Sequence, residues 1–204
     1  MKITKISAQQ KNAERVNIFV DGKYELSLSL GELLEQKIKV GTELDEAELK
    51  AIHKISADGK LKLRTLEWLM SRPRSRKELR EYLYKKKLDK EQIKALCEYF
   101  TGNGYQNDDT FARWWVDQRV RKNKSDLSIK TELQQKGISP ELIAKNLQLE
   151  SDNKQRLESL IISKNLHNKY PEKQKLIQYL RSKGFVYSDI VDVLAGLNTE
   201  TDNF

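Results

Sequence analysis

The sequence predicts a mainly α-helical protein, in which a small N-terminal appendage with a β-hairpin precedes three tandem three-helix repeats in an elongated, curved solenoid. Three observations predict this class. Only 38% of the 204 residues are hydrophobic and 33% are charged, which favours several thin modules over one compact core. An Asp-Gly pair separates two alternating segments near the N-terminus. One apolar spacing then recurs three times along the chain.

The appendage is expected to span residues 1–44. Apolar residues alternate with other residues at 16–20 and again at 24–30, and Asp21-Gly22 lies between the two segments. Asp-Gly at this place favours a two-residue hairpin turn, because both residues need a positive φ. The residues around Ile3 are expected to add a third strand.

A helical segment is expected to begin after Asp45. Asp45 is a good N-cap, and Glu46 and Glu48 follow in the first turn, near the positive end of the helix dipole. Gly59 is expected to break or kink this segment, since glycine is unfavourable inside a helix.

An internal repeat is the most informative signal. Residues 75–97, 125–147 and 171–194 share five apolar positions with the spacing 4, 5, 5 and 4. These frame positions are Leu79, Leu83, Leu88, Ile93 and Cys97; Ile129, Leu133, Ile138, Ile143 and Leu147; and Leu176, Leu180, Phe185, Ile190 and Leu194.

The spacing predicts two helices joined by a turn. Four residues return to the same helix face, and the five-residue interval leaves room for a turn at Lys136-Gly137 and at Lys183-Gly184. The first copy has Lys85, Lys86 and Lys87 there and no glycine. Another helix precedes each copy, so we expect repeats at 45–107, 108–151 and 152–197 and a tail at 198–204.

The excess positive charge is concentrated in one part of the chain. The formal net charge is +8, and residues 60–107 alone contain 13 basic and 6 acidic side chains. A localised basic face suits nucleic acid or an acidic protein surface. The alternative is a solvated Lys/Arg surface, and charge alone does not decide between them.

Several functional classes are disfavoured. Cys97 is the single cysteine, which excludes an internal disulfide and a cysteine-based zinc site. No apolar run is long enough to cross a membrane, and the first residues lack the apolar core of a secretory signal. We find no catalytic constellation, so we expect a cytoplasmic, non-enzymatic monomer without metal or cofactor.

Short motifs in the middle of the chain resemble the RecX family, bacterial regulators of the RecA recombinase. Residues 72–79 (RPRSRKEL) resemble its RxRSxxEL stretch, and residues 104–112 resemble GYLDDxxFA, with Gln106 in place of the leucine. Ile129, Glu132-Leu133 and 136–138 resemble RIxxELxxKGI. The family's usual Gly-Pro-x-Arg before that isoleucine is replaced here by residues 125–128.

The resemblance implies a function. It implies three three-helix repeats that bind along the RecA–DNA filament and depress its ATPase, strand exchange and coprotease activities, with DNA as a further partner. The alternatives are a stand-alone DNA-binding protein built from helix-turn-helix-like units and a scaffold repeat protein with an unrelated partner.

Two groups of cations are the candidate contact residues for RecA or DNA. They are Arg72, Arg74, Arg76, Lys77, Arg80, Lys85, Lys86 and Lys87, and Arg119, Arg121, Lys122 and Lys124. Trp114 and Trp115 lie near the second group and could stack on bases, although Trp115 has the spacing of a core residue. Ser75 and Glu78 are expected to form a capping box, and Asp108 and Asp109 to cap a helix.

Overall fold

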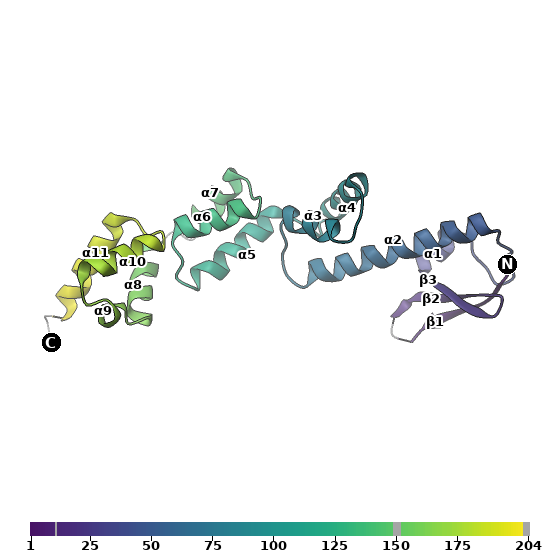
Figure 1. The fold of residues 1–204 in the computed structure, drawn as a ribbon, viewed down its shortest axis with the longest axis horizontal. Coiled ribbons are helices and arrows are strands. Elements are labelled where there is room, and N and C mark those ends of the chain that lie inside the picture. Colours follow the sequence, from purple (N-terminus) through teal and green to yellow (C-terminus); the bar gives the residue numbers. More distant parts are fainter. Residues whose placement is uncertain (11, 149–151, 202–204) are drawn as a thin grey trace. The chain divides into compact units, whose positions relative to one another are not determined.

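The computed structural model describes residues 1–10, 12–148 and 152–201, which form a small sheet followed by helices. The sheet strands are β1 (Ile3–Gln9), β2 (Asn12–Val20) and β3 (Lys23–Ser29). The helices are α1 (Leu30–Glu35), α2 (Glu46–Met70), α3 (Arg76–Tyr84), α4 (Lys90–Gly102), α5 (Asp108–Val120), α6 (Asp126–Gln135), α7 (Pro140–Gln148), α8 (Asn153–Ser163), α9 (Leu166–Lys169), α10 (Lys173–Ser182) and α11 (Tyr187–Thr201) (Figure 1). The mainly helical class is therefore confirmed.

The predicted hairpin and third strand are also confirmed. The sheet is antiparallel with the order β1-β2-β3, and Ile18 pairs with Ile6 on one side and with Leu26 on the other. Asp21 and Gly22 form the turn with φ of 48° and 81°, because only positive φ values match the twist of the two strands.

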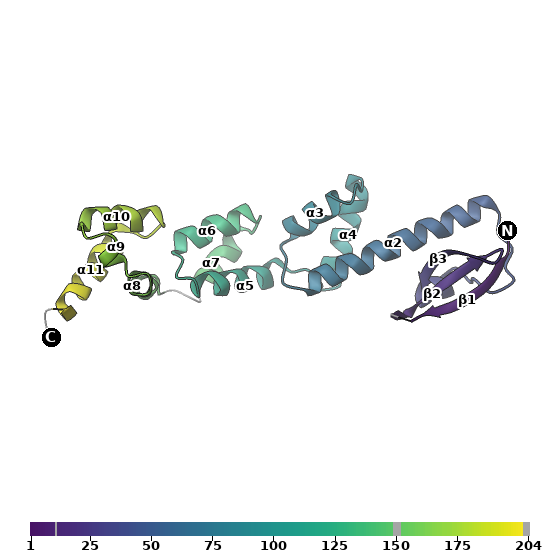
Figure 2. The same cartoon turned by 60° about the horizontal axis from the view of Figure 1, so that its bottom comes forward.

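Helix α2 covers the sheet, as Figures 1 and 2 show. Asp45 caps it in a capping box with Glu48. The Ser56 hydroxyl donates to the carbonyl oxygen of Ser27 in β3 at 2.7 Å. Apolar residues from the strands and from α2 form one core. Met1–Ser71 is therefore one compact unit, and the residues from Arg72 onward form a second.

The expected break at Gly59 is wrong, because α2 runs without interruption through all 25 of its residues. A Cβ atom at Gly59 would lie 1.8 Å from a carboxylate oxygen of Glu32 in α1. The space that this glycine leaves open on α2 is occupied by the Glu32 carboxylate. This use of glycine depends on a neighbour that is distant in sequence.

The repeated apolar frame forms the cores of the helical repeats. All frame positions are buried except Leu88 and Leu147, which are half-buried. In the second repeat the frame packs with Phe111, Ala112 and Val116 of α5, and the third repeat has a separate core with residues of α8. Burying each such side chain contributes about 1.5–3 kcal/mol, so the repeated pattern is a structural constraint.

A left-handed residue stands between the two frame helices of every repeat. Gly137 has a φ of 78° and Gly184 a φ of 86°, and Lys87 takes the same place with a φ of 61°. The turn predicted from the Lys-Gly pairs is confirmed. The first repeat makes it without glycine, although left-handed backbone is unfavourable for a residue with a Cβ atom.

Successive repeats are joined by one recurring contact. The backbone N–H of Arg76 at the start of α3 donates to Asp108, the first residue of α5, at 2.7 Å. The N–H of Asp126 at the start of α6 donates in the same way to Asn153, the first residue of α8, at 3.2 Å. The junctions between consecutive repeats therefore share a hydrogen bond that satisfies a helix N-terminus.

An ion pair inside the second repeat has its charges exchanged in the third. The Lys145 ammonium of α7 donates to Asp109 of α5 at 2.7 Å. At the equivalent positions, the Lys154 ammonium of α8 donates to Asp192 of α11, also at 2.7 Å. A helix that paired with the wrong repeat would bring two like charges together, so the exchange favours correct pairing.

This exchange predicts the outcome of a charge swap. Asp109→Lys alone and Lys145→Asp alone should each lower the Tm of the chain, because each places like charges side by side, and the double variant should recover most of the loss. Thermal unfolding followed by circular dichroism measures the three values.

Glu91→Lys is the matched control. Glu91 is the second residue of α4, as Asp109 is of α5, and it makes no ion pair with any residue that the structure describes. A double variant that is as unstable as the sum of the two single variants would contradict the pairing rule.

Candidate partner-binding groove

Helices α3 and α4 form a groove of about 760 Å³ whose lining is rich in cations. Arg76 and Arg80 lie one turn apart on α3, and Lys90 and Lys94 lie one turn apart on α4; all four are exposed. Lys77 and Lys85 complete the set of cations. The described lining contains only two carboxylates, those of Glu81 and Asp108, so the groove can attract an anionic partner.

Some of these cations lie where helix stability disfavours them. Arg76 and Lys77 are the first two residues of α3, and Lys90 is the first residue of α4. Free backbone N–H groups and the helix dipole make a helix N-terminus positive, so cations there are unfavourable. The fold does not require cations at these places, because the equivalent helices of the second repeat begin with Asp126 and Pro140.

The other two repeats act as an internal comparison. They have the same buried frame, but the positions equivalent to the six cations carry only one cation each, Lys130 in the second repeat and Lys173 in the third. The frame therefore folds without this charge. This observation favours a functional basic face over a merely solvated Lys/Arg surface.

The structure places the first group of predicted cations in different surroundings. Arg76, Arg80 and Lys85 line the groove with free access to solvent. Lys77 also lines it, but its ammonium donates to the carbonyl oxygen of Gln135 at 2.7 Å, across the junction with the second repeat. Lys86 lies over the ring of Tyr82 at 4.9 Å. Lys87 forms the left-handed turn.

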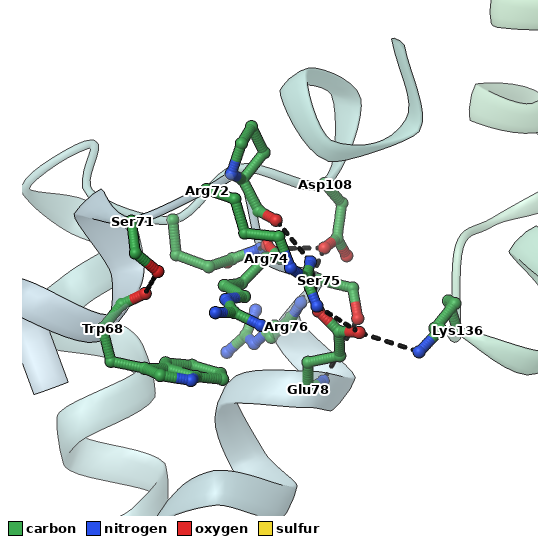
Figure 3. A network of polar contacts seen from close by, with 11 residues as sticks. Trp68, Ser71, Arg72, Arg74, Ser75, Arg76, Glu78, Asp108 and Lys136 are labelled. Carbon is green, nitrogen blue, oxygen red and sulfur yellow. Dashed lines mark hydrogen bonds and ion pairs between the residues drawn. The ribbon is translucent and has the colours of Figure 1, made fainter. Parts of the chain in front are cut away.

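Arg72 belongs to a polar network that joins the first two repeats (Figure 3). Its guanidinium donates to both carboxylate oxygens of Glu78, at 3.1 and 3.2 Å, and lies 5.1 Å from the ring of Trp114. Lys136 of the second repeat donates to the same carboxylate at 2.8 Å. These contacts hold the half-buried Arg72 at the junction of the two repeats.

The predicted capping box between Ser75 and Glu78 is wrong in one half. Ser75 accepts a hydrogen bond from the N–H of Glu78, as predicted. The Glu78 side chain, however, points to Arg72 and Lys136 instead of returning to the N–H of Ser75. Two charge-assisted hydrogen bonds are stronger than one bond to a neutral amide, so the long-range partners prevail.

The network shifts the pKa values of its members. Burial acts to raise the pKa of Glu78, but the hydrogen bonds from Arg72 and Lys136 outweigh it and hold the pKa below its usual 4.5. Burial, together with the neighbouring charge of Arg72, lowers the pKa of Arg74. Gln106, which replaces the leucine of the GYLDD motif, is buried here and donates to the carbonyl oxygen of Arg74 at 3.2 Å.

The second group of predicted cations divides in the same way. Arg119 is half-buried, pairs with Glu132 and lies 4.0 Å from the ring of Trp115. Arg121 pairs with Asp117 in its own helix at 3.0 Å. Lys122 and Lys124 are exposed at a separate hollow of about 520 Å³ between the second and third repeats.

The tryptophans beside this group serve the core. Trp114 and Trp115 pack against the core of the second repeat, and the Trp115 indole N–H donates to Glu132 at 3.0 Å. Both rings therefore already have partners within the protein.

Sequence reasoning missed Lys90 and Lys94, the two cations on the α4 wall. Their spacing of four residues places them on one helix face. They join Arg76 and Arg80 in one groove only when α4 packs against α3, which the spacing within either helix does not reveal. The prediction that Asp108 and Asp109 cap a helix is wrong, because Asn107 is the N-cap of α5 and accepts from the N–H groups of Asp109 and Thr110. The two aspartates lie in the first turn and accept hydrogen bonds from Gln106 and Lys145 instead. In the described ranges no three His, Cys, Asp or Glu side chains form a group that could hold a metal.

The low pKa of Glu78 predicts a pH-dependent contribution to stability. Glu78→Gln should destabilise the second unit by about 1–2 kcal/mol at neutral pH, because two cations lose a charged acceptor. A lowered carboxyl pKa adds stability above the usual value, and this stability is lost as the pH falls through the folded-state value. The difference in Tm between the parent chain and the variant should therefore shrink below about pH 4.5.

Glu81→Gln is the control, since Glu81 is exposed on the same helix. A Glu78→Gln difference that stays constant from neutral pH to pH 3 would contradict an ionised Glu78 at the junction. Circular dichroism at a series of pH values makes the comparison.

Models of one protein family match the N-terminal sheet and most of the first two repeats. The "Regulatory protein RecX N-terminal domain" matches residues 1–45, the "RecX, first three-helix domain" residues 62–100, and the "RecX, second three-helix domain" residues 107–147. The groove lies within the span of the two three-helix matches. In the part of the chain that the structure describes, no helix is long and apolar enough to span a membrane.

Whole-chain comparisons agree with these matches. A "Regulatory protein RecX" of Listeria innocua is 33% identical over 99% of this chain and 77% of its own length, and one of Bacillus pumilus is 37% identical over 93% and 74%. A crystal structure of a regulatory protein RecX superposes with a TM-score of 0.72 at 26% identity and covers 95% of this chain and 98% of its own. This chain, with its sheet, its three-helix repeats and its basic groove, belongs to the RecX family of regulatory proteins.

Proposed function

We propose that this protein binds the RecA–DNA filament and inhibits its ATPase, strand exchange and coprotease activities, as the family resemblance implies. It would act in the cytoplasm as a non-enzymatic monomer. The observation that carries the proposal is the basic groove, which occurs in the first repeat and not at the equivalent positions of the other two. A regulator needs such a surface for a partner, and a groove with cations on both walls can attract one.

The mechanism follows from charge and repetition. The cations of the groove attract an acidic surface of RecA or the phosphate backbone, which raises the rate of encounter. Contacts from the other repeats to neighbouring subunits then act at a high effective concentration. A protein held across several subunits resists the conformational cycle that accompanies ATP hydrolysis in the filament.

The test is a titration of the ATPase of RecA on single-stranded DNA. Lys90→Glu/Lys94→Glu should raise the concentration needed for half-inhibition about tenfold, because each substitution replaces attraction by repulsion. Its fold should be retained, since a glutamate at the first position of α4 is favourable for the helix and Lys94 is exposed.

Lys130→Glu/Lys173→Glu is the matched control, because it changes the charge equally at positions equivalent to Arg80 and Arg76. Equal inhibition by both double variants would exclude the groove as the contact. Arg72 is unsuitable for this test, because its reversal would place two carboxylates together at the junction.

The rival function is stand-alone DNA binding, which the sequence pI of about 9.3 favours. A direct DNA binder would bind duplex DNA tightly without RecA, with an affinity that falls steeply as salt rises. Fluorescence anisotropy with a labelled duplex, over a range of salt concentrations, distinguishes the two functions. We expect inhibition of RecA at protein concentrations that are too low to coat the DNA.

A further inference from the structure

The groove between α3 and α4 combines two rows of cations with an apolar floor. Ile93 and Cys97 of α4 are buried in the repeat and line the groove, and Tyr84 lies beside them with 73% of its surface exposed. We propose that this groove binds an acidic protein segment that inserts one apolar side chain between the cation rows. This inference rests on the proposed function in one respect: it names the chemistry of the partner at the same groove.

The walls match carboxylates at a helical spacing. Arg76 and Arg80 are separated by one turn of α3, and Lys90 and Lys94 by one turn of α4, so each pair spans about 5–6 Å along its helix. Glutamates one turn apart on a partner helix have the same separation. The guanidinium groups of α3 can each hold a carboxylate by two hydrogen bonds, and the ammonium groups of α4 add point charges.

The floor favours a protein partner over a phosphate backbone. Contacts to phosphates need cations and do not need an apolar surface between them. Here the cation rows are separated by Ile93, Cys97 and the aliphatic stems of the basic side chains. Burial raises the pKa of the Cys97 thiol, so the floor carries no charge of its own at neutral pH. An apolar side chain would gain by leaving water there.

Tyr84 marks the edge of this site. Its equivalents in the other repeats are Gln134 and Arg181, so the exposed ring is not part of the common frame. Tyrosine offers a large rigid surface at little entropic cost and is enriched where proteins meet. The ring could instead stack on a nucleotide base, and this outcome is included in the test.

Two of the charged groups that line the groove already have hydrogen-bond partners within the protein, so they are not available to a bound segment. The Lys77 ammonium donates to Gln135, and Asp108 accepts from the Arg76 N–H and from Gln106. Arg76, Arg80, Lys90 and Lys94, with Lys85 at the end of α3, therefore remain available to a partner. Their positions relative to the floor define a partner with acids on two sides and one apolar residue between them.

The test measures binding of a labelled synthetic helical peptide to the full chain by fluorescence anisotropy, with no RecA present. The peptide has glutamates one turn apart on either side of a central leucine, and a second peptide has alanine in place of that leucine. We expect the leucine peptide to bind about tenfold more tightly, the difference that burial of the larger side chain provides. Labelled oligo(dT) is the competing probe.

Variants of the protein separate the walls from the floor. Lys90→Glu/Lys94→Glu should weaken both peptides about equally, whereas Tyr84→Ala should weaken the leucine peptide more than the alanine peptide. Tyr84→Phe should retain the preference, because it keeps the apolar ring. Lys130→Glu/Lys173→Glu should leave both affinities unchanged.

Equal affinities for the two peptides, or oligo(dT) binding more tightly than either and losing affinity with Tyr84→Ala, would overturn the inference. These failures are distinct from a failure of the proposed function. If Lys90→Glu/Lys94→Glu abolishes RecA inhibition while the two peptides bind equally well, the proposed function stands and the inference of an acidic segment with an apolar side chain is wrong. If the leucine peptide binds more tightly as expected while the protein does not inhibit RecA, the inference about the groove stands and the proposed function is wrong.

Discussion

The left-handed turn between the two frame helices is the constraint on which the helical part of the structure depends. It reverses the chain within the five-residue interval, so that frame residues of both helices enter one core, as Leu133 and Ile138 do in the second repeat. Gly137 and Gly184 make the turn at no steric cost. Lys87 makes it with a side chain, and so the first repeat places a cation where the others have none. The same backbone geometry therefore supports different surfaces.

Repetition separates what the fold requires from what a partner requires. Because the frame is buried three times with nearly the same spacing, a residue that all repeats share is explained by packing or by the turn. A residue present in one repeat alone needs another reason. By this criterion the α4 cations Lys90 and Lys94 are functional candidates, since Pro140 and Ala144 replace them in the second repeat and Tyr187 and Val191 in the third.

Local chemistry made most of the fold predictable from the sequence. The Asp21-Gly22 turn, the Asp45 cap and the frame burial each depend on residues within a few positions of one another, and each is confirmed. Gly59 and Glu78 were misinterpreted because their partners are remote. Glu32 fills the space beside Gly59, and Lys136, 58 residues away, competes for Glu78. Side chains with a choice of partners follow the strongest charge within reach.

The same reasoning explains why only part of the candidate groove could be predicted. A count of basic residues found the charge but could not divide it into structural and available cations. Packing makes that division: Arg72 and Arg119 are held by Glu78 and Glu132, while Arg76 and Arg80 stay exposed. Position in the sequence does not reveal which cations are held, because Arg72 and Arg76 are only about four residues apart and yet differ in their contacts.

The strength of the helix caps explains how the fold tolerates the groove. The cations that begin α3 and α4 oppose the helix dipole, and each helix has a cap directly before them. The Ser75 hydroxyl accepts from the N–H of Glu78, and the Asp89 carboxylate accepts from the N–H of Gln92 in a capping box. Asp89 also places a negative charge beside Lys90, which lowers the repulsion from the helix end. Caps of this kind satisfy the backbone groups that a bound anion would otherwise satisfy, so the groove can present its cations to a partner without needing that partner in order to fold.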